Sequence, residues 1–100
     1  MSVVLSATME TVRVMEKLIG KIVVVDTSTS LVYMGRLREV NERWIEMEEV
    51  DLIDLGEIKI SRELLLIEKK RDGLKASRGS VMLTARAIVS ISVLEEIIDP

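Results

Sequence analysis

Two short polar segments carry the side chains best suited to binding chemistry. Trp44 is the only Trp in a chain with one Tyr and no Phe, and it stands where the polar segment 41–43 meets an alternating apolar run. An outward-pointing ring at such a junction can stack on a nucleic-acid base, and Arg86 can contact a phosphate or a base. Each residue also has a structural interpretation. Trp44 can cover a helix or a subunit interface, and Arg86 can pair with an acid of a neighbouring subunit.

Catalysis has little support in the composition. The 100 residues include no Cys and no His, which removes thiolate catalysis, imidazole acid–base chemistry, disulfides and the usual transition-metal ligands. The sequence contains no glycine-rich phosphate loop and no nucleophile–base arrangement. One group of acidic residues could hold a hard cation but lacks the spacing of a cation-binding loop: Glu46, Glu48, Glu49, Asp51 and Asp54. We therefore expect a protein that is not an enzyme and that uses no metal or cofactor.

Basic residues gather in one segment of an otherwise acidic chain. The formal net charge is −3, whereas segment 69–78 holds five basic residues and one acid. Such a patch can hold a phosphate, but basic residues are also typical of the last turn of a helix, and we favour that interpretation. No apolar run approaches the ~18 residues of a membrane span, and residues 3–5 are too short for a signal-peptide core. We expect a soluble, cytoplasmic protein with no membrane association.

Five short strands and two helices must position these side chains. The order of apolar and turn-forming residues predicts a helix, three antiparallel strands, a second helix and two further strands, all in one domain of residues 1–100. In the first helix, Ser6 or Thr8 is available as N-cap, although residues 11–15 also alternate as a strand would. The predicted ranges are a helix at 7–19, strands at 21–25, 31–40 and 44–48, an irregular connection at 49–60, a helix at 62–71, a strand ending segment 74–83, a connection at 84–87 and a strand at 88–94.

The second strand predicts a sharp bend and a register. Gly35 stands where the burial pattern changes, as a bent barrel strand requires. The first strand is apolar from Ile22 to Val25, so we expect it to be buried on both faces. With a three-residue loop at 41–43, Val40 opposes Trp44. Arg38 then opposes Glu46 and Arg36 opposes Glu48, so we expect these arginines to pair with glutamates rather than with nucleic acid.

These elements resemble the Sm and Sm-like (LSm) family. The resemblance covers about two-thirds of the chain and implies a mostly β fold. This would be a small five-stranded SH3-like (Sm-type) barrel with an N-terminal helix and a second helix inserted before the fourth strand. That insertion makes the chain similar to a divergent, bacterial-type member. The first Sm motif is matched by residues 18–25, Gly35-Arg36-Leu37, the loop 41–43 and residues 44–48, and the second, more loosely, by residues 81–92.

The resemblance also implies partners and site residues. It implies a homo-oligomeric ring of six or seven subunits, closed by pairing of the fourth strand with the fifth strand of the next subunit. It further implies binding of single-stranded, uridine-rich RNA by two loops, with Asn41, Arg43, Trp44, Thr84 and Arg86 as the candidate RNA-binding residues.

Several of these positions depart from the family pattern. The family's loop Asp corresponds to Asn41 or Glu42, and its base-contacting Asn falls on Trp44 or Ile45, with the strand alternation favouring Trp44. The Arg-Gly pair of the second loop corresponds to Thr84-Ala85, and Arg78-Gly79 is either a displaced copy or a chance dipeptide. Arg86 lies about where the bacterial host-factor branch has a His. The alternative function is therefore a structural or protein-interaction ring that has lost RNA binding.

Overall fold

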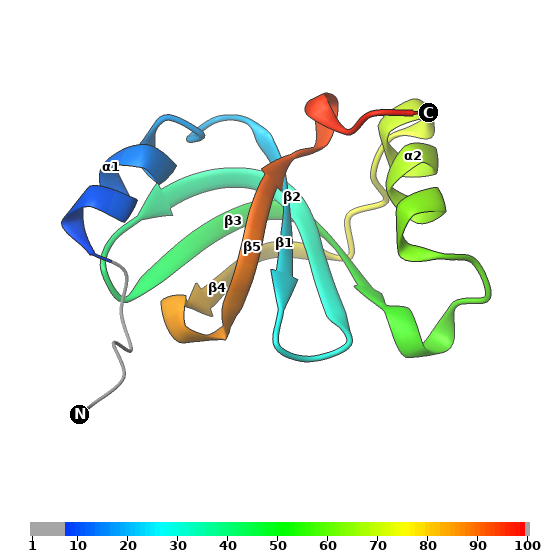
Figure 1. Ribbon diagram of the computed structural model, residues 1–100, viewed down its shortest axis with the longest axis horizontal. Helices are drawn as coiled ribbons and strands as arrows, with labels where there is room; N and C mark the ends of the chain where they lie inside the picture. Colours follow the sequence, from blue (N-terminus) through cyan, green and yellow to red (C-terminus); the bar gives the residue numbers. More distant parts are fainter. Residues whose placement is uncertain (1–7, 100) are drawn as a thin grey trace.

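A single five-stranded antiparallel sheet organises the chain, and the computed structural model describes residues 8–99 of it (Figure 1). The strands are hydrogen-bonded in the order β4-β3-β2-β1-β5. The elements in chain order are α1 (Met9–Glu16), β1 (Ile22–Thr27), β2 (Leu31–Val40), β3 (Trp44–Asp54), the 3-10 turn η1 (Leu55–Glu57), α2 (Arg62–Asp72), β4 (Arg78–Thr84), η2 (Ala85–Ala87), β5 (Ile88–Val93) and η3 (Leu94–Glu96). The predicted order of helices and strands is confirmed.

The helix α2 begins at Arg62, as the sequence predicts. The helix α1 begins at Met9 instead of at the predicted residue 7, which lies outside the described residues. Thr8 caps α1 by accepting a hydrogen bond from Thr11 N at 3.1 Å, whereas Ser6 lies outside the described residues. The predicted helix 7–19 is too long, because Gly20 donates its N–H to Leu37 O at 2.7 Å and draws the chain toward β2. For α2, Ser61 Oγ accepts from Leu64 N, and Gly73 ends the helix with φ at +92°.

The prediction of an irregular connection at 49–60 is wrong for residues 49–54, because β3 continues to Asp54. Between the pairs Arg36↔Glu48 and Met34↔Asp51, β3 carries one residue more than β2. Glu49 takes a φ of +52° there, which marks a β-bulge. The bulge shifts the in–out alternation of β3 by one residue, and this breaks the pattern from which a strand is predicted.

Gly35 is required by a close approach of two strands. A Cβ built on Gly35 would lie 2.9 Å from Glu48 O and 3.1 Å from two atoms of Val50. No side chain fits there without a shift of the β3 backbone. The predicted bend of β2 at this glycine is therefore explained by its contact with the bulged part of β3.

Both faces of the sheet are buried, each against a different helix. The inner face packs Val23, Val25 and other strand residues against Val12 and Met15 of α1. The outer face packs Val24 and its neighbours against Leu65 and Leu66 of α2. The prediction that β1 is buried on both faces is confirmed. The inserted helix α2 thus completes a second core on the side of the sheet opposite α1.

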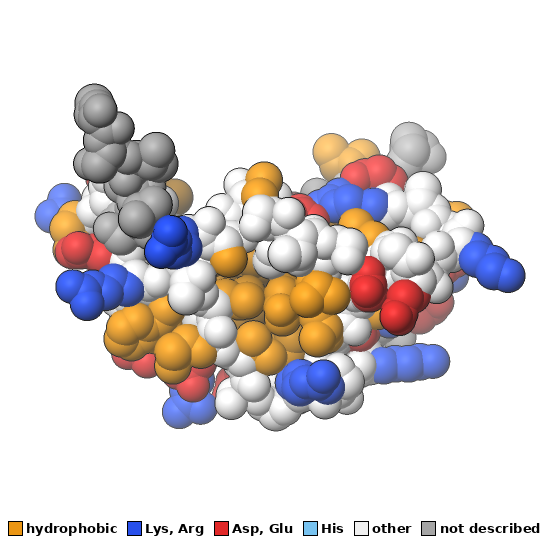
Figure 2. Space-filling model, turned by 90° about the horizontal axis from the view of Figure 1, so that it is seen from below, with side chains coloured by type: hydrophobic (Ala, Val, Ile, Leu, Met, Phe, Trp, Pro, Cys, Tyr) orange, Lys and Arg blue, Asp and Glu red, His pale blue; other side chains and the backbone are white. Residues whose placement is uncertain are grey.

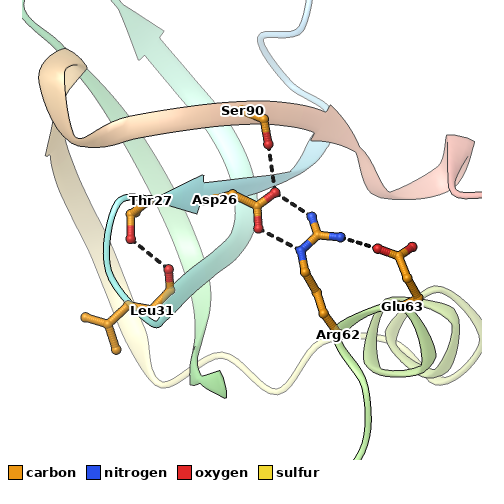
Figure 3. Close-up of polar contacts among 6 residues, drawn as sticks. All are labelled: Asp26, Thr27, Leu31, Arg62, Glu63 and Ser90. Atoms are coloured by element: carbon orange, nitrogen blue, oxygen red, sulfur yellow. Dashed lines mark hydrogen bonds and ion pairs between the residues drawn. The ribbon is translucent and has the colours of Figure 1, made fainter. Parts of the chain in front are cut away.

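Two ion pairs fasten α2 to the sheet. At its start, Arg62 binds the Asp26 carboxylate of β1 through two nitrogens, and Ser90 Oγ of β5 donates to the same carboxylate at 2.7 Å (Figure 3). Partial burial opposes ionisation of Asp26, but the hydrogen bonds from Arg62 and Ser90 outweigh it and lower its pKa. Near the end of α2, Lys69 Nζ lies 2.7 Å from Asp51 Oδ2.

The predicted closed barrel is not formed by backbone pairing. β4 pairs with β3 and β5 pairs with β1, so within the described residues both are edge strands. The three-residue η2 joins the two edges at one end, and Figure 1 shows the strands diverging from it. The structure is therefore a strongly bent sheet with two free edges. Within residues 8–99, no helix has the length and apolar character needed to cross a membrane.

Candidate nucleic-acid interface

The two predicted binding loops lie side by side at one end of the molecule. Ala85 N donates to Arg43 O at 2.8 Å, which joins η2 to the turn between β2 and β3. The next pair of the β3–β4 ladder is Trp44 opposite Thr84. Since the Arg43–Ala85 pair is hydrogen-bonded, Trp44 and Thr84 form the non-hydrogen-bonded type of pair, in which side chains lie closest. The structure thus brings Arg43, Trp44, Thr84 and Arg86 together.

Asn41 shapes the turn that presents Trp44. Its Oδ1 accepts hydrogen bonds from Arg43 N at 2.8 Å and from Trp44 N at 3.0 Å. Asn41 N in turn donates to Trp44 O at 3.0 Å. These bonds tighten the loop and place Val40 opposite Ile45, so the predicted pairing of Val40 with Trp44 is wrong.

The tighter turn also changes the arginine register. The pairing shifts by one residue between Leu37 and Glu39, which leaves Arg38 outside the ladder. The predicted Arg38–Glu46 pair is therefore wrong, and Glu39 takes the place opposite Glu46. The predicted Arg36–Glu48 register is confirmed. Both arginines do contact glutamates, as expected: Arg36 Nη1 lies 2.6 Å from Glu49 Oε1, and Arg38 Nη1 lies 3.4 Å from Glu48 Oε2.

Trp44 lies on the outward face of the β3–β4 pair, as its parity predicts. Ile45 and Met47 are fully buried on the inner face, whereas Trp44 is half-buried. On its own face Trp44 has Thr84 directly opposite and Met82 one diagonal step away. The Met82 side chain is 62% exposed. Met82 was not singled out in the sequence, because its place beside Trp44 depends on the β3–β4 register.

Two arginines flank this surface. Arg43 and Arg86 are exposed, and neither guanidinium forms an ion pair or hydrogen bond within residues 8–99. Thr84 is exposed as well. The surface also carries acids, with Glu42 exposed in the turn and Glu46 half-buried beside Trp44. Among the described residues, the two loops thus bring together an aromatic ring, two exposed cations and a hydroxyl.

The basic segment 69–78 does not contribute to this surface. Figure 1 shows α2 at the opposite end of the 39 Å long axis from η2 and the β2–β3 turn. Three cations of the helix end have partners: Lys69 binds Asp51, Lys70 Nζ donates to Ile97 O at 2.6 Å, and Arg71 pairs with Asp72. Arg78 donates to the neighbouring Ser77 O. The helix-end interpretation of this segment fits these contacts.

Grooves and metal-binding clusters are other possible kinds of site among the described residues, and neither coincides with the two loops. Two grooves lined by described residues, of about 410 and 280 Å³, share Ile22, Lys70 and Leu94 and include no residue of the two loops. Within the described part of the chain, no group of three or more acidic residues is arranged to hold a metal ion.

Comparison with known proteins identifies the fold. No protein-family model and no curated protein matches the sequence. The structure is similar to that of a Pyrococcus abyssii Sm protein in complex with a uridine heptamer. The two superpose with a TM-score of 0.53 over 81% of this chain and 93% of that chain, at 15% sequence identity. The chain therefore has an Sm-like fold, as the sequence resemblance implies.

Proposed function

We propose that this protein is a non-catalytic, ring-forming Sm-like protein that binds single-stranded RNA. The binding surface consists of the turn 41–44 and residues 84–86. One observation carries the proposal: the Ala85 N–Arg43 O hydrogen bond holds the chain's only Trp and two exposed arginines, which have no ion-pair partner among residues 8–99, at one end of the molecule. An aromatic platform with flanking cations is the usual arrangement for single strands, because bases stack on the ring while cations neutralise phosphates.

The structural neighbour supports this choice of ligand. That protein shares the fold and was solved with a single-stranded uridine heptamer. Arg86 lies about where the bacterial host-factor branch has a His, and we therefore propose that the chain is a divergent, bacterial-type member. A cytoplasmic location follows as part of the proposal, since the ligand is cellular RNA.

The free edges of the sheet support assembly into a ring. β4 and β5 each leave one row of backbone N–H and C=O groups unpaired within the described residues, and such edges favour pairing with another strand. The exposed Val89 of β5 and Met82 of β4 add apolar surface at these edges. Figure 2 shows hydrophobic side chains gathered in the middle of the face seen from below. Pairing of β4 with β5 of the next subunit closes a ring, for which we propose six or seven subunits.

The test combines oligomer mass with RNA affinity. Native mass spectrometry is expected to give a closed oligomer, and fluorescence anisotropy with labelled oligouridine at low salt is expected to show binding. Trp44→Ala and Arg86→Ala should weaken binding while leaving the oligomer intact. Arg71→Ala is the matched control, because it removes an exposed arginine at the other end of the molecule and should leave affinity unchanged.

A second candidate function is a ring scaffold that binds protein instead of RNA. The acids Glu42 and Glu46 beside Trp44 and the net charge of −3 favour it, since they oppose binding of a polyanion. An intact oligomer that binds no oligonucleotide at low salt would establish the scaffold and eliminate the RNA proposal. Equal loss of affinity in Arg71→Ala and Arg86→Ala would also count against the proposed surface.

A further inference from the structure

We propose that this surface binds single strands without selecting the base, and that Asn41 closes the turn instead of reading a base. The inference rests on the RNA-binding function proposed above for the same loops. The sequence resemblance implies uridine-rich RNA, whereas the geometry of the turn removes the groups that such selection needs.

The side-chain amide of Asn41 is already occupied. An amide distinguishes bases when its oxygen accepts from the base and its nitrogen donates to it at the same time. Here Oδ1 receives two hydrogen bonds from the backbone, at 2.8 Å from Arg43 N and 3.0 Å from Trp44 N. Only the Nδ2 donors remain. A lone donor finds an acceptor on every base and on every phosphate, so it carries no base preference.

Several backbone groups of the two loops are occupied as well. The N–H groups of Arg43 and Trp44 donate to Asn41 Oδ1, and Ala85 N donates to Arg43 O. Trp44 O accepts from Asn41 N. These hydrogen bonds lie within the protein and hold the two loops in place, so these N–H groups do not read a base edge.

What remains is a stacking surface with cations. Trp44 presents a half-buried ring next to Thr84 and close to the exposed Met82, which extends the apolar surface along β4. Every base has a π-face, so stacking tolerates any sequence. Arg43 and Arg86 contact the phosphates, which are the same in every sequence.

The experiment compares labelled oligouridine, oligoadenine and oligocytidine of equal length in anisotropy titrations with the full-length protein. The proposal expects three dissociation constants within about threefold of one another, because stacking strength alone separates them. Trp44→Ala should weaken all three by roughly 5- to 150-fold, whereas Trp44→Phe should retain part of the affinity. Asn41→Asp keeps a side-chain oxygen for the turn and removes the Nδ2 donors. The added negative charge of Asn41→Asp should lower the affinities for all three oligonucleotides and leave the ratios of their dissociation constants unchanged.

The outcomes separate the two proposals. Binding of oligouridine tenfold or more tightly than oligoadenine would overturn base tolerance and leave RNA binding standing. A change in the ratios in Asn41→Asp, with the thermal unfolding midpoint of the protein retained, would also overturn it by showing that Asn41 reads a base. No binding of any oligonucleotide at low salt would overturn the RNA-binding function and this inference with it.

Discussion

The Lys69–Asp51 ion pair offers a test of how the inserted helix is held. The Asp51 side chain is 4% exposed and that of Lys69 is 15% exposed, with Nζ and Oδ2 2.7 Å apart. Asp51 Oδ2 also accepts from Lys75 N at 2.9 Å, so one carboxylate holds both α2 and the connection that follows it. In Lys69→Met the aliphatic stem is kept, but a buried carboxylate loses its only cation among the described residues.

Breaking a buried pair by removing one partner costs about 3–5 kcal/mol. With a urea m-value of about 1.5 kcal/mol/M, this lowers the unfolding midpoint of Lys69→Met by roughly 2–3 M. Arg71→Met is the control, because Arg71 lies on the same helix with its side chain 66% exposed and paired with Asp72. Its cost should stay below about 1 kcal/mol.

The double variant separates the ion pair from simple packing. Asp51→Asn keeps an acceptor for Lys75 N and removes the charge, so Asp51→Asn combined with Lys69→Met leaves no unpaired charge. Its free energy of unfolding should fall by less than the sum of the two single losses. Equal midpoints for Lys69→Met and Arg71→Met, or strict additivity in the cycle, would refute the claim that this pair anchors α2.

Three further predictions follow from the packing and the Asp26 site. Gly35→Ala should cost about 1–3 kcal/mol in urea unfolding, because its Cβ meets β3 atoms at 2.9 and 3.1 Å, whereas Gly79→Ala meets nothing within 4 Å and should cost nothing. Leu66→Ala should lose about 2–5 kcal/mol in the same assay, since Leu66 is 1% exposed between α2 and the sheet. Burial of Asp26 opposes ionisation of its carboxyl group, but the hydrogen bonds from Arg62 and Ser90 outweigh this effect. The pKa of Asp26 therefore lies below its ordinary 3.8. Ionised Asp26 thus stabilises the fold above that pH, and this contribution is lost as the pH falls through the folded-state pKa. Urea unfolding between about pH 5 and pH 2 should therefore show a smaller acid-induced loss in Asp26→Asn than in the wild type.

The sequence predicts most of this fold because its local signals agree with the final structure. Ser61 and Gly73 mark the ends of α2, and the alternation of Ile45 and Met47 identifies the start of β3. These features are local: each depends on a cap, a period or a backbone conformation that a few residues determine.

The differences arise where geometry depends on distant residues. The bulge at Glu49 forms because β2 and β3 meet across Gly35, so segment 49–54 loses the alternation by which a strand is recognised. The register error at Arg38 comes from two hydrogen bonds to Asn41 Oδ1, whose partners no spacing rule predicts. Closure of the barrel depends on β4 and β5, which are separated by the whole sheet and remain edges in the described chain.

The candidate site also combines features that local sequence patterns predict with features that only the tertiary structure shows. The parity of Trp44 follows from alternation, and the pairing of its strand with β4 confirms its outward place. That the loops 41–43 and 84–87 meet was implied by the family resemblance, and the Ala85–Arg43 hydrogen bond gives it a physical basis. The commitment of Asn41 to the turn is a tertiary fact, and it changes the interpretation of a residue whose type alone suggests base recognition.

The most direct test of the central claim is photocrosslinking of the assembled protein to a single strand that contains 4-thiouridine, with the attached peptides identified by mass spectrometry. The proposed function predicts crosslinks to residues 41–44 and 84–87, with Trp44 the principal site and α2 unlabelled. Crosslinks confined to the basic end of α2 at residues 69–72, or no crosslinks from an intact oligomer at low salt, would contradict the claim.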